Sequence, residues 1–135
     1  MKLYYASAES GTPDLAEFLG TLEPKLRIKL IHQFHQLMTQ PLPVEPTVKH
    51  FSIERYSALY ELRARSQVMV RIVFTIRDDG NILFLVPFVK KHTRNTMQAL
   101  NGSLKILKQA QLGECRVEEM TVEWILKEIG NAKLT

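Results

Sequence analysis

The basic side chains in the middle of the chain are the residues whose chemistry stands out. Residues 47–110 carry eleven Lys and Arg against four Asp and Glu, a balance of +7, whereas residues 1–46 and 111–135 have balances of −1 and −2. Positive charge gathered in one segment suits a polyanionic partner, because ammonium and guanidinium groups bind phosphate oxygens. Charge alone favours a solvated basic surface equally well.

Other reactive side chains give weaker signals. His32 and His35 lie one turn apart on a predicted helix, but no carboxylate or cysteine accompanies them, so we predict no metal site. His92, beside two lysines, is a candidate for acid–base chemistry. We expect Glu61 to pair with a neighbouring arginine, and Asp78-Asp79 to form a turn.

Length and composition indicate a single globular domain. The 135 residues are 45% hydrophobic and 24% charged, and such a chain can bury a core without disulfides or metals. The single cysteine, Cys115, cannot form an internal disulfide, which favours a reducing cytoplasm. Residues 1–10 lack the apolar core of a signal peptide, and the longest apolar run, 82–89, is too short to span a bilayer. We therefore expect a cytoplasmic protein with no membrane partner.

Apolar periodicity predicts which elements position the basic residues. Apolar stripes over residues 15–22 and 26–38 predict two N-terminal helices, and three prolines then break the pattern between residues 40 and 47. Alternating residues 68–77, the turn signal 78–81 and the apolar run 82–88 predict a β-hairpin with one apolar and one partly basic face.

Two more helices are predicted after the hairpin. The first is capped by Asn95 or Thr96 and ends near Gly113, and the second runs from Thr121 as N-cap to Gly130 as stop signal. The order predicts an α+β fold: two N-terminal helices, a curved antiparallel β-sheet and C-terminal helices.

Three short motifs follow one another across this predicted sheet. They are Leu59-Tyr60-Glu61-Leu62-Arg63, Val70-Arg71-Ile72 and Phe88-Val89-Lys90-Lys91. Their order and spacing resemble the RelE/ParE toxin superfamily, and specifically its phage-derived HigB-like branch, over about residues 12–110. The resemblance implies a RelE-like toxin domain at residues 1–111, followed by a C-terminal helical extension at 112–135. That extension could pack on the domain, form a dimer contact or occupy the place of an antitoxin.

The resemblance also implies an activity and partners. Such toxins belong to type II toxin–antitoxin systems and are generally ribosome-dependent mRNA endonucleases, without cofactor. The implied partners are a cognate antitoxin protein and mRNA on the ribosome, in a homodimer or a toxin–antitoxin hetero-oligomer. Two alternatives stay open: a ParE-like toxin that inhibits DNA gyrase, and a non-catalytic RNA-binding phage remnant.

The family's functional positions fall on the basic segment. The resemblance implies Arg71, Lys91 and Lys90 as catalytic residues, and Arg63 and Arg94 as RNA-binding residues. From their place in the basic segment we add His92 as a catalytic candidate, and Arg65 and Lys49 as RNA-binding candidates. The sequence departs from the family pattern in three ways: Val70 replaces a tyrosine, Asn95-Thr96 replaces a closing Thr-Pro, and Met97 replaces a tyrosine that supports the chemistry in some RelE-type nucleases.

Cations can support RNA cleavage without a metal. The 2′-hydroxyl attacks its own 3′-phosphorus, and each well-placed donor stabilises the charge on the phosphoryl oxygens by roughly 3 kcal/mol. A lysine among other cations can act as base, because neighbouring positive charge lowers its pKa. We expect Arg71 to clamp the phosphate, Lys90 and Lys91 to stabilise charge or move a proton, and Arg63 to position the backbone.

The register of the strands that carry Arg63 and Arg71 is left open by the sequence. A two-residue turn between their strands would put the two side chains on opposite faces of the sheet, whereas one more residue would put them on the same face.

Overall fold

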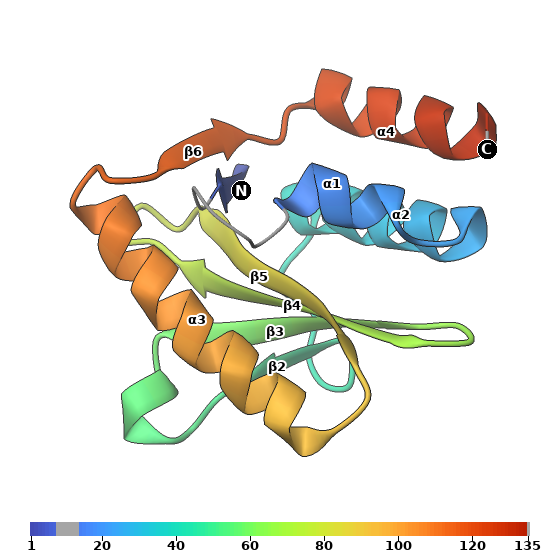
Figure 1. Cartoon of the computed structure of the whole chain (residues 1–135). Coiled ribbons are helices and arrows are strands. Elements are labelled where there is room, and N and C mark those ends of the chain that lie inside the picture. The colour runs from blue at the N-terminus through green and yellow to red at the C-terminus, as the bar shows by residue number, and fades with distance from the viewer. Residues whose placement is uncertain (8–13, 135) are drawn as a thin grey trace.

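The computed structural model describes residues 1–7 and 14–134 and shows a six-stranded sheet with helices on both faces (Figure 1). In chain order the elements are β1 (Leu3–Ser7), α1 (Leu15–Gly20), α2 (Pro24–Thr39), β2 (Val48–His50), η1 (Glu54–Tyr56), β3 (Leu59–Arg65), β4 (Met69–Ile76), β5 (Ile82–Lys90), α3 (Thr93–Gln111), β6 (Arg116–Glu119) and α4 (Val122–Leu134). The strand order is β2-β3-β4-β5-β1-β6. The predicted α+β class is confirmed.

The sheet is mixed, which corrects the prediction of an antiparallel sheet. Strands β2 to β5 form an antiparallel meander, but β1 pairs with β5 in parallel, with Leu3 opposite Ile82 and Tyr5 opposite Phe84. Leu3, Tyr5 and Ala6 are all buried, as is typical of a strand inside a sheet that is covered on both faces. A short apolar run is the sequence signal of such a strand, but it does not specify the neighbouring strand.

The segment after residue 111 packs on the domain. It contains a strand as well as the expected helix, because β6 adds to β1 in antiparallel orientation. Met120 and Ile125 lie in the core, and Nη2 of Arg27 on α2 donates to Oε2 of Glu128 on α4 at 2.8 Å. The β6–β1 pairing and the buried ion pair thus attach both parts of this segment to the rest of the structure.

The last helix does not stop at Gly130, which corrects that prediction. Thr121 caps α4 as expected, since its Oγ1 accepts from the backbone N–H of Trp124 at 3.1 Å. The helix nevertheless continues to Leu134. A glycine inside a helix costs about 1 kcal/mol relative to alanine, and the packing of Ile125 and Ile129 against the core outweighs that cost.

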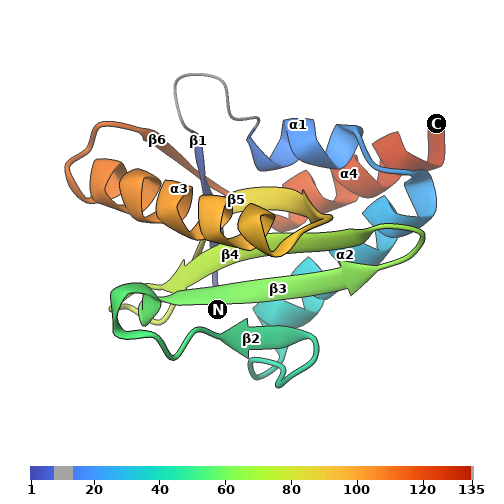
Figure 2. The ribbon, with the colours of Figure 1, turned by 60° about the horizontal axis from the view of Figure 1, so that its bottom comes forward.

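Two cores lie on opposite faces of the sheet. On one face α1, α2 and α4 cover a cluster that includes Phe34, Phe74 and Phe84. The ring centroid of Phe84 lies 5.2 Å from that of Phe34 and 5.6 Å from that of Phe74. On the other face α3 covers a smaller cluster that includes Val73 and Leu100. Figures 1 and 2 both show that α3 leaves the end of the β3–β4 hairpin uncovered. The partly basic face predicted for residues 68–77 contributes Arg71 at that end.

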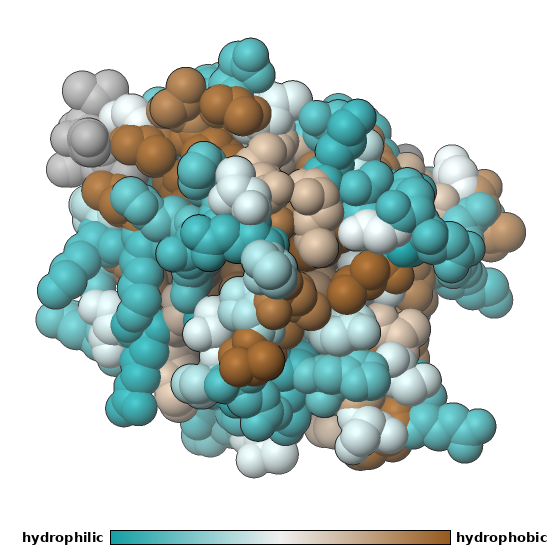
Figure 3. Space-filling view, turned by 180° about the vertical axis from the view of Figure 1, so that it is seen from behind, coloured by the Kyte–Doolittle hydropathy of each residue, from teal (hydrophilic) through white to brown (hydrophobic). Residues whose placement is uncertain are grey.

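The outer surface differs between the two ends of the molecule. On α4, Val122 and Leu126 are exposed, and Figure 3 shows apolar side chains at the upper left, where α4 lies. Long hydrophilic side chains lie below them, at the end where β3 turns into β4. Within residues 1–7 and 14–134, no helix combines the length and apolar character needed to cross a bilayer.

Candidate nucleic-acid interface

Arg63 and Arg71 lie side by side on the face of the sheet that packs against α3, at the hairpin end that α3 itself leaves uncovered (Figure 1). Three residues, Ser66 to Val68, connect β3 to β4, and Arg63 is directly opposite Arg71 in the resulting register. Because directly paired residues project to the same face, the structure resolves the register that the sequence left open. The motifs containing the two arginines therefore contribute to one surface.

A buried carboxylate holds these two arginines together. Oε1 of Glu61 accepts a hydrogen bond from Nε of Arg63 at 2.9 Å and one from Nη1 of Arg71 at 3.3 Å. Glu61 is 1% exposed, so it is not itself a surface group. We call Glu61, Arg63 and Arg71 the arginine cluster. Glu61 pairs with two arginines, where the sequence predicted an arginine partner.

The environment of Arg71 leaves its positive charge poorly compensated. Burial and the charge of Arg63 lower the pKa of the Arg71 guanidinium, and the carboxylate of Glu61 acts in the opposite sense. Nε of Arg71 is buried without a hydrogen-bond partner, and Nη2 faces the Sδ atom of Met69 at 3.9 Å. An anion that approached this group would supply both compensating charge and acceptor atoms.

The remaining predicted catalytic residues lie where β5 leads into α3. Lys90 ends β5 opposite Met69, and Lys91, His92 and Arg94 are exposed at the start of α3. We call Lys90, Lys91 and Arg94 the junction cations, and His92 lies among them. Across residues 1–7 and 14–134, no hydrogen bond or ion pair joins their side chains to the arginine cluster. The arginine cluster and the junction cations therefore lie at the same end of the sheet without direct contact between their side chains by hydrogen bond or ion pair, within the described residues.

The start of α3 corrects one prediction. His92 is the N-cap and Thr93 the first residue of the helix, so neither Asn95 nor Thr96 is the cap. Asn95 acts from inside the first turn, where its Oδ1 accepts from the backbone N–H of Lys91 at 2.9 Å and of His92 at 2.7 Å. The backbone between β5 and α3, which carries the junction cations, is therefore fixed.

Two further predicted RNA-binding residues flank the arginine cluster. Arg65 is exposed at the end of β3. Lys49 on β2 is paired with Glu61 in the sheet, and its Nζ lies 5.4 Å from the centroid of the Phe51 ring. Both lie on the same sheet face as Arg63, because side chains alternate along a strand and directly paired residues share a face.

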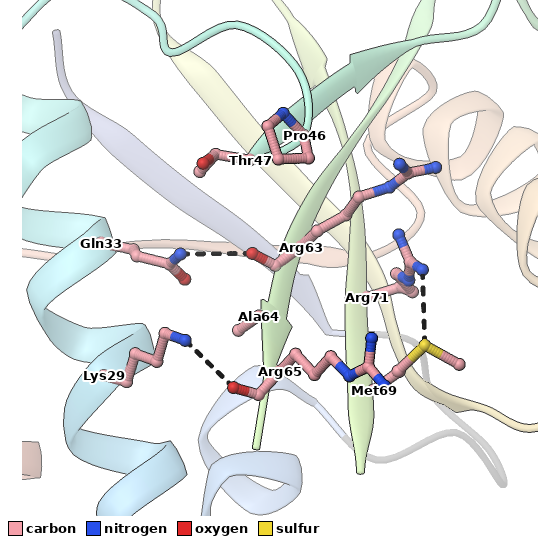
Figure 4. Close-up of a pocket in the computed structure, with 9 residues that line it drawn as sticks. All are labelled: Lys29, Gln33, Pro46, Thr47, Arg63, Ala64, Arg65, Met69 and Arg71. Carbon is pink, nitrogen blue, oxygen red and sulfur yellow. Dashed lines mark hydrogen bonds between the residues drawn. The ribbon is translucent and has the colours of Figure 1, made fainter. Parts of the chain in front are cut away.

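A pocket of about 420 Å³ connects the arginine cluster with helix α2 across the free edge of β3 (Figure 4). We call it the edge pocket. Its lining consists of Lys29, Gln33, Pro46, Thr47, Arg63, Ala64, Arg65, Met69 and Arg71. Of these, Arg63, Arg65 and Arg71 were predicted as site residues. Lys29 and Gln33 were not, because nothing in their helical pattern points to strands so distant in sequence.

The other candidate residues fall away from this site. His32 and His35 are exposed on α2. In the part of the chain that the structure describes, no three His, Cys, Asp or Glu side chains gather as a metal site would require. Asp78 and Asp79 lie in the β4–β5 turn, where Oδ1 of Asp79 accepts from the backbone N–H of Asn81 at 2.9 Å. They are turn formers, as predicted.

Comparison with known protein families identifies the family to which the chain belongs. Residues 17–108 match the family described as phage derived protein Gp49-like (DUF891). The chain belongs to this Gp49-like family. No curated protein and no solved structure matches the chain.

The Gp49-like match covers the whole of the candidate interface. It includes α2, the meander from β2 to β5, the junction cations and most of α3, whereas β1, β6 and α4 lie outside it. The Gp49-like family is RelE-like and toxin-like, so the predicted phage-derived, toxin-like character is confirmed. The narrower assignment to a HigB-like branch stays a prediction.

Proposed function

We propose that this Gp49-like protein is the toxin of a toxin–antitoxin pair and that it cleaves mRNA bound to the ribosome. The observation that carries the proposal is the arginine cluster. Two guanidinium groups from neighbouring strands share one oxygen of a buried carboxylate, next to an open pocket. Paired guanidinium groups suit the oxygens of a phosphodiester, because each presents a planar fork of donors.

The net charge of the cluster supports binding of an anion. Glu61 neutralises one of the two arginines, which leaves an excess of one positive charge in a partly buried setting. The Arg71 side chain is 12% exposed and that of Arg63 is 25% exposed. Both are therefore held in place before a substrate arrives, and donors held in advance contribute most to stabilising a transition state.

The proposed reaction breaks one phosphodiester bond. The 2′-hydroxyl loses its proton to a base and its oxygen attacks the adjacent phosphorus, which gives a 2′,3′-cyclic phosphate. The 5′-oxygen leaves and takes up a proton from an acid. Arg71 binds the phosphoryl oxygens, Arg63 positions the backbone, Lys90 and Lys91 stabilise charge or transfer a proton, and His92 is a candidate for the acid or base.

Expression in bacteria tests this proposal. The wild-type chain, the double variant Arg71→Ala with Lys91→Ala, and a control Lys25→Ala on the exposed side of α2 are expressed, and mRNA 5′ ends are mapped. We expect growth arrest and new cuts inside translated codons for the wild type and the control. The double variant should be harmless yet folded, as judged by circular dichroism.

Several outcomes would contradict the proposal. Retained toxicity in the double variant would show that Arg71 and Lys91 do not take part in cleavage. Gyrase-dependent DNA breaks without mRNA cuts would indicate a ParE-like toxin instead. Normal growth with intact mRNA on expression of the wild type would indicate a non-catalytic RNA-binding protein.

A further inference from the structure

The edge pocket extends beyond the residues that the proposed cleavage reaction uses. Its far wall is formed by α2, which contributes Lys29 and Gln33. Figure 4 shows these two side chains on one side of β3 and the guanidinium groups of Arg63 and Arg71 on the other. A ligand in this pocket would therefore span the strand edge, from the arginine cluster to the helix.

The pocket exists because β3 is longer than its outer neighbour. Strand β2 pairs with β3 only from Tyr60 to Leu62, so the carbonyl groups of Arg63 and Arg65 have no partner strand. Nε2 of Gln33 donates to the carbonyl of Arg63 at 3.2 Å, and Nζ of Lys29 donates to that of Arg65 at 3.0 Å. These contacts cover an otherwise open sheet edge.

The side chains of Lys29 and Gln33 can both form further hydrogen bonds. An ammonium group carries three donors, and the contact with Arg65 uses one of them. Oε1 of Gln33 is buried and has no hydrogen-bond partner. An unpaired buried acceptor is costly, and a ligand that donates to it would remove that cost.

The remaining lining adds apolar surface to the pocket. Pro46, Ala64 and Met69 line it between Lys29 and the arginines, with Ala64 directed towards α2 and Met69 on the arginine side of β3 (Figure 4). The volume of about 420 Å³ falls in the range of clefts that hold small organic ligands. Apolar walls within a cationic rim match the two parts of a nucleotide, its base and its phosphate.

We propose that the edge pocket binds a nucleotide next to the scissile phosphodiester of a single-stranded RNA. This inference rests on the proposed function, which puts the scissile phosphate at Arg63 and Arg71. Lys29 binds the phosphate of the flanking nucleotide, and Oε1 of Gln33 accepts a hydrogen bond from its base. The RNA strand thus crosses the edge of β3, and the pocket selects the nucleotide that flanks the cleaved phosphodiester.

Binding of a short, fluorescent 2′-O-methyl RNA tests this site independently of cleavage. Such an RNA cannot be cut by the proposed reaction, because it has no free 2′-hydroxyl to attack the phosphorus. The Kd is measured against salt concentration for the wild-type chain, Lys29→Gln and Gln33→Leu. The matched control is Lys25→Gln, which removes an exposed charge one turn away on the same helix and outside the pocket. We expect Lys29→Gln to lower the slope of log Kd against log salt by about 0.7, the contribution of one phosphate contact to a single strand.

The Gln33 variant distinguishes the base contact from the phosphate contact. Gln33→Leu should weaken binding about five-fold, as for one neutral hydrogen bond, and should leave the salt slope unchanged. The same slope for Lys29→Gln and Lys25→Gln would overturn the subsite, as would failure of the wild type to bind the RNA. If the wild type binds and Lys29 contributes while no mRNA is cut in cells, the nuclease proposal fails, and the edge pocket stands only as a nucleotide subsite of an RNA-binding protein.

Discussion

The arginine cluster and the junction cations are two basic regions built in opposite ways. Arg63 and Arg71 are partly buried and share a carboxylate, whereas Lys91, His92 and Arg94 are exposed on a fixed backbone. Immobilising an exposed long side chain costs up to about 2 kcal/mol of conformational entropy, and a side chain already held loses less on binding. The cluster is therefore suited to holding the reacting phosphate in place, and the junction side chains to adjusting to the bound RNA and moving protons.

Of the changes that distinguish the two regions, removal of the Glu61 carboxylate should have the largest effect on stability. Glu61→Ala leaves two partly buried guanidinium groups without their shared acceptor, and we expect it to lower the free energy of unfolding by on the order of 3 kcal/mol. Urea denaturation measures the change. The control Glu54→Ala removes an exposed carboxylate and should have little effect. Equal stability of the two variants would mean that Glu61 does not hold the cluster.

The junction should depend on a backbone cap rather than on ion pairs. Asn95→Ala removes the acceptor for the N–H groups of Lys91 and His92, and we expect a loss of about 1 kcal/mol in the free energy of unfolding. Thermal unfolding is an adequate measurement. Asn95→Asp keeps the acceptor and serves as the matched variant. Loss of stability in Asn95→Asp as large as in Asn95→Ala would contradict this account of the cap.

The junction cations themselves should be nearly neutral for stability. Lys91→Gln and Arg94→Gln remove exposed charges that have no ion-pair partner within the described residues, so each should change the free energy of unfolding by less than about 0.5 kcal/mol. Denaturant titration of the two variants beside the wild type checks this. A loss of about 1.5 kcal/mol or more would show that the junction is as tightly built as the cluster.

The β4–β5 hairpin could be predicted from the sequence because its signals are local. Apolar alternation sets the strands, and the turn requires residues that tolerate unusual backbone angles. Gly80 has a φ of 83°, in the left-handed region that favours glycine. By contrast, β6 has the sequence Arg-Val-Glu-Glu, without apolar alternation, and it forms because β1 offers an edge to pair with.

The candidate site could be predicted only in part. The basic residues of β3 and β4 stand out in the sequence, but their common face depends on the three-residue connection between the strands. Lys29 and Gln33 are 36 and 30 residues away from the strand positions that they contact. Such contacts arise from packing of α2 against the sheet, and helical periodicity reports only which side of the helix is polar.

Cleavage of mRNA by the purified protein on programmed ribosomes is the sharpest test of the proposed role of Arg71. The wild type should release fragments that end in a 2′,3′-cyclic phosphate and a 5′-hydroxyl. Arg71→Ala should cut at least about 100-fold more slowly while remaining folded, because one pre-oriented donor at the developing charge is lost. Cutting by Arg71→Ala at the wild-type rate would contradict the role of the arginine cluster.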